Sequence, residues 1–74
     1  MSYDKVLDTS GLFCPQVLLK AKKLLSSMEK GEILKVISTD PSSVLDFKVF
    51  VATHSHALVK VSQQKKKFTF WIKK

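Results

Sequence analysis

The 74-residue chain is long enough for one hydrophobic core and too short for a second, so we expect a single domain over residues 1–74. Its formal charge is +7, and all 13 basic side chains are lysines. The absence of arginine argues against a protein that recognises base edges or phosphates through bidentate guanidinium contacts. No stretch approaches the ~20 apolar residues of a membrane span, and the first residues lack the apolar segment of a signal peptide. We therefore expect a cytoplasmic protein with no membrane segment.

The first half of the chain predicts a strand, a helix and a second strand. Residues 3–10 alternate loosely between apolar and polar side chains and end in turn formers, which is typical of a strand. From Pro15 onward, apolar side chains recur at spacings of three and four and indicate a helix with one buried stripe: Val17, Leu18, Ala21, Leu24, Leu25 and Met28. Gly31 is a candidate left-handed cap at the end of this helix, and the β-rich segment 32–39 follows as a strand.

The middle of the chain predicts a second helix. Asp40 or Ser42 can cap its N-terminus, and Pro41 suits its entry. Over residues 44–54 the apolar side chains follow a helical spacing rather than alternation: Val44, Phe47, Phe50 and Val51. We therefore predict a helix here, although the segment also contains β-branched residues.

The last part of the chain alternates and predicts two strands joined by a hairpin. Residues 56–64 and 66–74 form the strands, and the connection lies at residues 63–65. Alternate apolar side chains of the last strand share one face: Phe68, Phe70 and Ile72. Trp71 points to the opposite face, where it is a candidate docking anchor because tryptophan is enriched at interaction hot spots.

The predicted order of elements is therefore βαβαββ. Four strands in one mixed sheet can cover one face with two helices, which is an economical arrangement for a small α/β chain. We expect an α/β (α+β) two-layer sandwich with two helices on one face of the sheet. The other sheet face is expected to be at least partly open to solvent or to a partner.

The only cysteine stands where a loop passes into the first helix. With Pro15 as the first helical residue, Cys14 becomes the N-cap. There the sulfur would lie near the free N–H groups of the first turn and the positive end of the helix dipole, and both stabilise the nucleophilic thiolate. Gly11 permits a tight approach from the first strand, and Leu12 and Phe13 can fold back to leave Cys14 at the tip. The alternative is a small, buried and inert cysteine, which is common among free cysteines.

A single thiolate in a chain this small suits a carrier better than an enzyme with a cleft. A hydrolase would need a base, an orienting residue and an oxyanion hole, and no motif around His54 or His56 supports one. Structural or solvated roles fit both histidines better. A dithiol oxidoreductase would need a second cysteine, and one cysteine with two histidines falls short of a zinc site, so we expect no metal. A carrier of sulfur fits, because a persulfide is a reversible state of cysteine.

Several motifs together resemble the TusA/SirA family of small sulfur-carrier proteins. They are the stretch Asp8-x-x-Gly11-Leu12-x-Cys14-Pro15, the pairs Gly31-Glu32 and Asp40-Pro41, Asp46 with Phe50 after it, and the step His56-x-Leu58. The resemblance covers nearly the whole chain, in order and with matching spacing. It implies a single TusA-like domain with the βαβαββ order.

The resemblance also implies that Cys14, positioned by Gly11 and Pro15, carries a transient persulfide with no other cofactor. A sulfur-donor protein, such as a cysteine desulfurase or a rhodanese-like protein, would load it, and an acceptor relay protein would receive the sulfur. Nucleic acid would be reached only indirectly, in one branch through thiolation of the tRNA wobble uridine. Other branches serve molybdenum-cofactor or oxidative sulfur metabolism. The chain would be a sulfurtransferase in the sense of a persulfide carrier rather than a turnover enzyme acting on small substrates.

The chain departs from the family pattern at three positions. The motif is usually Cys-Pro-x-Pro, and Val17 stands at its second proline, which restores a backbone N–H in the first helical turn. Ser55 stands where a glycine often precedes the family histidine, and Lys48 stands where a proline is frequent. These differences suggest a divergent member with different partners.

Contacts with partners are expected at lysines of the first helix. Lys20 and Lys23 are candidates for meeting an acidic partner near the thiol, against the alternative that they are solvated surface lysines. A function of another class stays open, namely a basic RNA-binding or regulatory module with an incidental cysteine. The +7 charge, the aromatic last strand and an element order resembling the C-terminal domain of translation initiation factor 3 favour that alternative. A third interpretation is a structural domain that binds a protein through its open sheet face.

Overall fold

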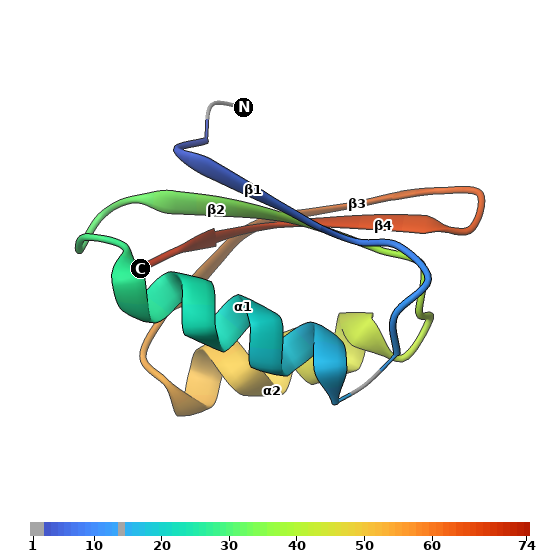
Figure 1. Ribbon diagram of the computed structural model, residues 1–74, viewed down its shortest axis with the longest axis horizontal. Coiled ribbons are helices and arrows are strands. Elements are labelled where there is room, and N and C mark those ends of the chain that lie inside the picture. The colour runs from blue at the N-terminus through green and yellow to red at the C-terminus, as the bar shows by residue number, and fades with distance from the viewer. Residues whose placement is uncertain (1–2, 14) are drawn as a thin grey trace.

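The computed structural model describes residues 3–13 and 15–74. Six elements follow one another in the predicted order (Figure 1): β1 (Lys5–Thr9), α1 (Gln16–Ser27), β2 (Ile33–Ser38), α2 (Ser43–Thr53), β3 (Ala57–Gln64) and β4 (Lys67–Lys73). The predicted βαβαββ order is confirmed, and the differences are confined to the ends of the elements. None of the helices in these ranges is long and apolar enough to cross a membrane.

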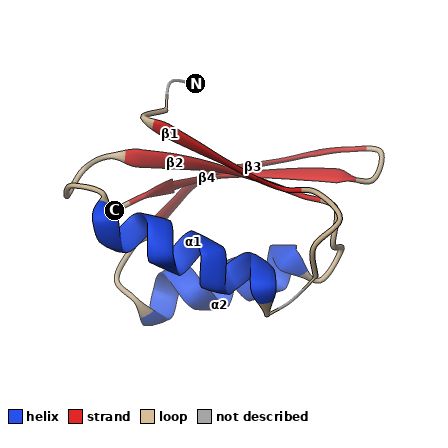
Figure 2. Ribbon diagram, viewed as in Figure 1, coloured by secondary structure: helices blue, strands red, loops and turns tan. Residues whose placement is uncertain are grey.

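The four strands form one mixed sheet in the order β1-β2-β4-β3. β1 and β2 are parallel, whereas β4 runs antiparallel to both β2 and β3. Both helices lie on the same face of the sheet, and among the described residues no element covers the opposite face (Figure 2). The predicted two-layer α/β fold is thereby confirmed.

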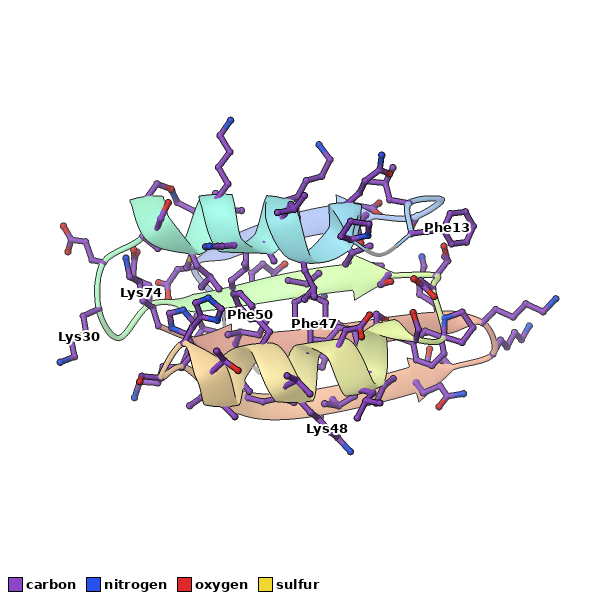
Figure 3. The ribbon with its side chains drawn as sticks, turned by 90° about the horizontal axis from the view of Figure 1, so that it is seen from below. Phe13, Lys30, Phe47, Lys48, Phe50 and Lys74 are labelled. Atoms are coloured by element: carbon purple, nitrogen blue, oxygen red, sulfur yellow. The ribbon has the colours of Figure 1, made fainter. Side chains whose placement is uncertain are left out.

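The hydrophobic core fills the space between the helices and the sheet. Phe47 of α2 is fully buried between the two helices and the sheet (Figure 3), and its ring centroid lies 4.6 Å from that of Phe70. The helical stripe predicted for α1 supplies three buried side chains: Val17, Ala21 and Leu25. The strands add the side chains that face the helices: Leu34, Val36, Phe68, Phe70 and Ile72. Burying each large apolar side chain stabilises the fold by about 1.5–3 kcal/mol.

Asp40 organises the entry of α2. One carboxylate oxygen of Asp40 accepts hydrogen bonds from the backbone N–H and the hydroxyl of Ser42, at 3.0 and 2.9 Å. Ser42 itself occupies the N-cap position without a side-chain capping bond. Of the two predicted caps, Asp40 therefore supplies the hydrogen bonds, in a local turn of the kind that Asp side chains form with the backbone two residues on.

The end of α1 is closed by Lys74, from the far end of the described chain. Its ammonium group donates to the carbonyl of Met28 at 2.5 Å and to that of Ser26 at 3.4 Å. Gly31 has the predicted left-handed conformation, with a φ of +94°, but it stands in the turn beyond the helix, because Met28 is already the extended C-cap residue. A lysine at this position also interacts favourably with the negative end of the helix dipole.

Candidate functional site

Three connections meet at one end of the sheet. Residues 10–15 leave β1, residues 39–42 leave β2, and the turn between β3 and β4 reaches the same end because β4 runs antiparallel to β2 (Figure 1). The backbone N–H of Gly11 donates to the hydroxyl oxygen of Thr39 at 2.9 Å and ties the first two connections together. The residues on either side of Cys14 therefore lie at the same edge as the entry to α2.

Hydrogen bonds fix the beginning of the 10–15 loop. The carboxylate of Asp8 accepts from the hydroxyl of Ser10 at 2.6 Å and from its backbone N–H at 2.9 Å. These two bonds, with a weaker effect of the Lys67 charge, hold the pKa of Asp8 below its usual 3.8. Gly11 follows with a φ of +83°, a conformation that L side chains rarely adopt. This backbone conformation is a physical reason for a glycine at the position.

Cys14, the predicted nucleophile, lies outside the described residues. Of its two apolar neighbours, Leu12 packs against the core, whereas Phe13 is 64% exposed. The expectation that both side chains fold back is therefore wrong for Phe13, because only Leu12 leaves the backbone on the side of the core. An exposed phenylalanine next to the only cysteine is a candidate contact for a partner that approaches the thiol. The hydrophobic pattern alone does not distinguish it from Leu12.

The helix that follows begins one residue later than predicted. α1 starts at Gln16, and Pro15 is its N-cap with a φ of −93° and a ψ of 3°. The carbonyl of Phe13 accepts from the N–H of Gln16 at 2.8 Å, and the carbonyl of Pro15 accepts the first full-turn bond from Leu19 at 3.0 Å. The prediction of Pro15 as the first helical residue, with Cys14 as N-cap, is therefore wrong by one position. A tight turn precedes the helix, and position 14 stands directly before the cap.

The predicted docking lysines lie along α1. Lys20 and Lys23 line a groove between α1 and the edge strand β1, together with Leu7, Leu24 and Ser27. Both lysines are exposed. The structure therefore brings these two side chains together, but along the helix and beside β1 rather than within the loop that contains Cys14.

A cluster of lysines beside that loop is a feature that sequence reasoning missed. The hairpin connection, predicted at 63–65, consists of Lys65 and Lys66, because β3 extends to Gln64 and β4 begins at Lys67. We refer to residues 64–67 as the lysine turn. With Thr39 the lysine turn lines a hollow at the end of the sheet. Because Thr39 is bonded to Gly11, the positive charge of the lysine turn lies close to the 10–15 loop. Only the pairing of β4 with β2 shows this proximity, since the two segments are far apart in sequence.

The two histidines lie at the other end of the molecule. Nδ1 of His54 is 3.0 Å from the carbonyl oxygen of Phe50, and the rings of His54 and His56 are parallel with centroids 6.4 Å apart. Burial, with smaller effects of His54 and Lys74, holds the pKa of His56 below its usual 6.5. In Figure 3, Lys74 lies at the end opposite Phe13, and Phe50 lies on the same side of Phe47 as Lys74. This position fits the structural or solvated roles expected for both histidines. In residues 3–13 and 15–74, no three His, Cys, Asp or Glu side chains form a group that could hold a metal ion.

The sequence is similar to those of several known proteins over nearly its whole length. Residues 5–74 match the model of the family described as Sulfurtransferase TusA. The chain is similar to the Sulfur carrier protein TusA of Allochromatium vinosum, with 46% identity over 72 residues that cover 97% of this chain and 95% of that protein. It is also similar to the Sulfur carrier protein TusA of Pseudomonas syringae pv. tomato, with 35% identity over 74 residues that cover all of this chain and 88% of that protein. The Putative sulfur carrier protein YrkI of Bacillus subtilis is 35% identical over 74 residues, covering 100% of this chain and 99% of that protein.

Proposed function

The chain belongs to the TusA family of sulfurtransferases, and we propose that it relays sulfur as a persulfide on Cys14. The observation that carries the proposal is the family match over residues 5–74, in a chain whose only cysteine stands between β1 and α1. The comparisons favour this function over a basic RNA-binding or regulatory module. The protein acts as a carrier with a covalent intermediate and not as a turnover enzyme on small substrates.

The proposed transfer is an exchange between two sulfur groups. The Cys14 thiolate attacks the terminal sulfur of a donor persulfide, a new S–S bond forms, and the donor's S–S bond breaks as the donor leaves as a thiolate. The proton on the terminal sulfur stays with it, and no external oxidant is needed because the donor cysteine is reduced as Cys14 is oxidised. In delivery, a thiolate of the acceptor attacks the terminal sulfur of the Cys14 persulfide, and Cys14 leaves as a thiolate.

The start of α1 supports the thiolate that this exchange requires. Position 14 directly precedes the N-cap Pro15, and the first N–H groups of a helix carry partial positive charge. A nearby helix N-terminus lowers the pKa of a cysteine and increases its thiolate fraction. Gly11 gives the loop its left-handed turn, and the lysine turn adds positive potential at the same end of the sheet.

The proposed partners are two proteins of the reducing cytosol. A cysteine desulfurase or a rhodanese-like protein supplies the sulfur, and an acceptor relay protein removes it, in one branch toward thiolation of tRNA uridine. Lys20 and Lys23 in the α1 groove are proposed contacts for an acidic surface of one of them. Nucleic acid is reached only through the acceptor.

Loading of the thiol tests the proposal directly. The protein is incubated with a cysteine desulfurase, its pyridoxal cofactor and cysteine, and its intact mass is measured without reductant. We expect a gain of one sulfur atom that a reductant reverses and that Cys14→Ser abolishes. The absence of any such gain, with desulfurase shown to be active by its alanine production and with a rhodanese-like donor tried as well, would refute the carrier function.

A kinetic comparison tests the docking lysines separately. In Lys20→Gln/Lys23→Gln, loading from the protein donor should slow at low donor concentration and recover at high concentration, because the encounter is weakened and the chemistry is not. Reaction of Cys14 with a small polysulfide should be unchanged. Equal slowing with both donors would assign the effect to the thiol rather than to docking.

A further inference from the structure

The sheet face opposite the helices contains a buried donor without an acceptor. Trp71 points to this face because it lies between the core residues Phe70 and Ile72 in β4, as the sequence predicts. However, its side chain is only 9% exposed, and its indole N–H is buried with no hydrogen-bond partner among the described residues. Buried N–H groups are nearly always paired in proteins, so an acceptor that reached this indole would remove an unfavourable unpaired donor.

Lysine side chains, instead of a helix, cover the indole. The ammonium nitrogens of Lys35 and Lys60 lie 5.7 and 5.3 Å from the centroid of the Trp71 ring. Lys35 also lies 4.9 Å from the centroid of the Tyr3 ring. Both ammonium groups are therefore held over aromatic rings, where they are available to an anion that docks from solvent.

Of these groups, Lys35 and Trp71 border a hollow of about 210 Å³ on the uncovered face, which we call the sheet-face hollow. Its lining residues are Lys35, Ser62, Gln64, Lys67, Thr69 and Trp71. Every lining side chain has a hydrogen-bond donor, and none carries a negative charge. Gln64 and Lys67 also belong to the lysine turn, which lies beside Thr39 and the 10–15 loop (Figure 1). A basic surface is thus continuous from Trp71 to the loop that contains Cys14.

We infer that the sheet-face hollow docks an acidic segment of a partner protein in the sulfur relay, which rests on the carrier function proposed above. Carboxylates only accept hydrogen bonds when ionised, so they match a hollow of ammonium, hydroxyl and indole donors. The net charge of +7 favours an acidic partner over long range as well. A segment bound here leaves the α1 groove of Lys20 and Lys23 uncovered. The carrier therefore has separate basic surfaces for a donor and an acceptor, one along α1 beside β1 and one on the sheet face, next to the lysine turn.

Nucleic acid fits this surface less well, although its phosphates are acceptors too. Proteins that bind single strands offer open aromatic faces on which bases stack. Here Lys35 and Lys60 already occupy positions over Trp71, and Lys35 lies over Tyr3. The hollow therefore offers anion contacts without a stacking platform.

Tryptophan fluorescence tests the inference, because Trp71 is the only tryptophan in the chain. The full chain is titrated with a polyglutamate peptide at low salt and again at ~0.15 M salt, where surface charges are screened within about 8 Å. We expect a change in Trp71 emission, weaker affinity at the higher salt, and affinity reduced about fivefold or more in Lys35→Gln/Lys67→Gln. The matched control Lys22→Gln/Lys48→Gln, which removes the same charge from the two helices, should lose less than about twofold.

Three results would overturn the inference. The first is a Trp71 emission that polyglutamate does not change, and the second is an equal loss of polyglutamate affinity in the two lysine double variants. The third is a single-stranded oligonucleotide of equal charge that binds more tightly than polyglutamate and depends on Lys35 and Lys67. Trp71→Phe, whose binding is measured by calorimetry, should also bind polyglutamate more weakly because it lacks the indole N–H. If this variant does not fold, the two lysine double variants still test the inference. Because the titration does not use the thiol, Cys14→Ser should bind like the unsubstituted chain. If sulfur does not load but polyglutamate binds as expected, only the carrier function is refuted. If sulfur loads but polyglutamate does not bind, only the docking site is refuted.

Discussion

At the scale of single residues, the loop before α1 depends on the backbone conformation of Gly11. Its φ of +83° lies in the left-handed region, and a Cβ built at this position would meet no atom within 4 Å. Substitution therefore adds conformational strain but no steric overlap. Left-handed backbone at a non-glycine residue is unfavourable by roughly 1–2 kcal/mol, partly offset by the lower entropy of the unfolded chain.

We predict that Gly11→Ala lowers the free energy of unfolding by about 1 kcal/mol, measured by urea denaturation. Gly11→Asn should lose less, because asparagine tolerates this conformation better than alanine. Gly31→Ala, at a φ of +94° and also without a neighbour within 4 Å, is the matched control for stability. If both alanine variants lose stability equally but only Gly11→Ala loads sulfur more slowly, the loop conformation is needed for transfer. An unchanged stability of Gly11→Ala would contradict the argument from strain.

His56 makes the stability of the fold dependent on pH. Because its folded-state pKa is held below 6.5, chiefly by burial, the native state favours the neutral ring. Between the lowered pKa and 6.5 the unfolded chain binds more protons than the folded one, so stability falls as the pH drops through this window and is fully present above it.

The corresponding measurement compares urea midpoints at pH 7.5 and at pH 5.5. We predict a lower midpoint at the acidic pH for the unsubstituted chain and a smaller difference for His56→Gln. His54→Gln should keep most of the difference, because burial of His56 is the largest cause of its shift. Asp8 does not contribute in this range, since its carboxylate titrates below 3.8. A pH dependence that survives His56→Gln unchanged would assign it to another group.

The sequence could predict the site residues whose type alone determines their chemistry or their backbone conformation. Cys14 is the only thiol, and Gly11 does adopt a conformation that suits glycine. The exposure of Phe13 and the position of the lysine turn were missed. Both depend on tertiary structure, because one follows from the direction of a loop side chain and the other from strand pairing.

At the scale of secondary-structure elements, α1 is fixed at both ends by groups outside the helix. Its start is set by a tight turn before Pro15, and its end is closed by the ammonium group of Lys74. Val17 in the first turn is buried in the core, so the residue at the second proline of the family motif contributes apolar packing here. The helical stripe was predicted correctly because it depends on spacing, whereas the exact start was not, because the local hydrogen bonds of Phe13 and Pro15 decide it.

We predict that Lys74→Gln lowers the free energy of unfolding by about 0.5–1 kcal/mol, because it removes the charge that faces the last carbonyls of α1. Lys73→Gln, at an exposed neighbouring position in β4, is the matched control and should change stability much less. Urea denaturation measures both, and amide hydrogen exchange near Met28 should quicken only in Lys74→Gln. Equal losses in the two variants would show that Lys74 acts through net charge rather than through the helix terminus.

At the scale of the whole molecule, the fold follows from the alternation and helical spacing of the apolar residues. Both helices bury apolar side chains on the same sheet face, and Phe68, Phe70 and Ile72 of β4 provide the opposing surface. The β1-β2-β4-β3 order was not predicted, since strand order depends on which edges the helical crossovers leave free. That order places β4 in the interior of the sheet, and it brings the lysine turn to the end where the 10–15 loop lies.

The charge of the whole molecule opposes this compact fold. Thirteen lysines against six acidic side chains give +7, and folding brings these like charges closer together. Added salt screens their repulsion, with a Debye length that falls from about 30 Å at 0.01 M to about 8 Å at 0.15 M.

We therefore predict that the urea midpoint rises between these two sodium chloride concentrations at pH 7.5. In a Lys22→Gln/Lys48→Gln variant, which removes two exposed positive charges from the helices, the midpoint at low salt should be higher and the rise smaller. Repeating the titration with sodium fluoride distinguishes screening, which is the same for both salts, from specific binding of chloride. A midpoint that falls with salt would show that attractive ion pairs, and not self-repulsion, dominate the electrostatic free energy of the folded chain.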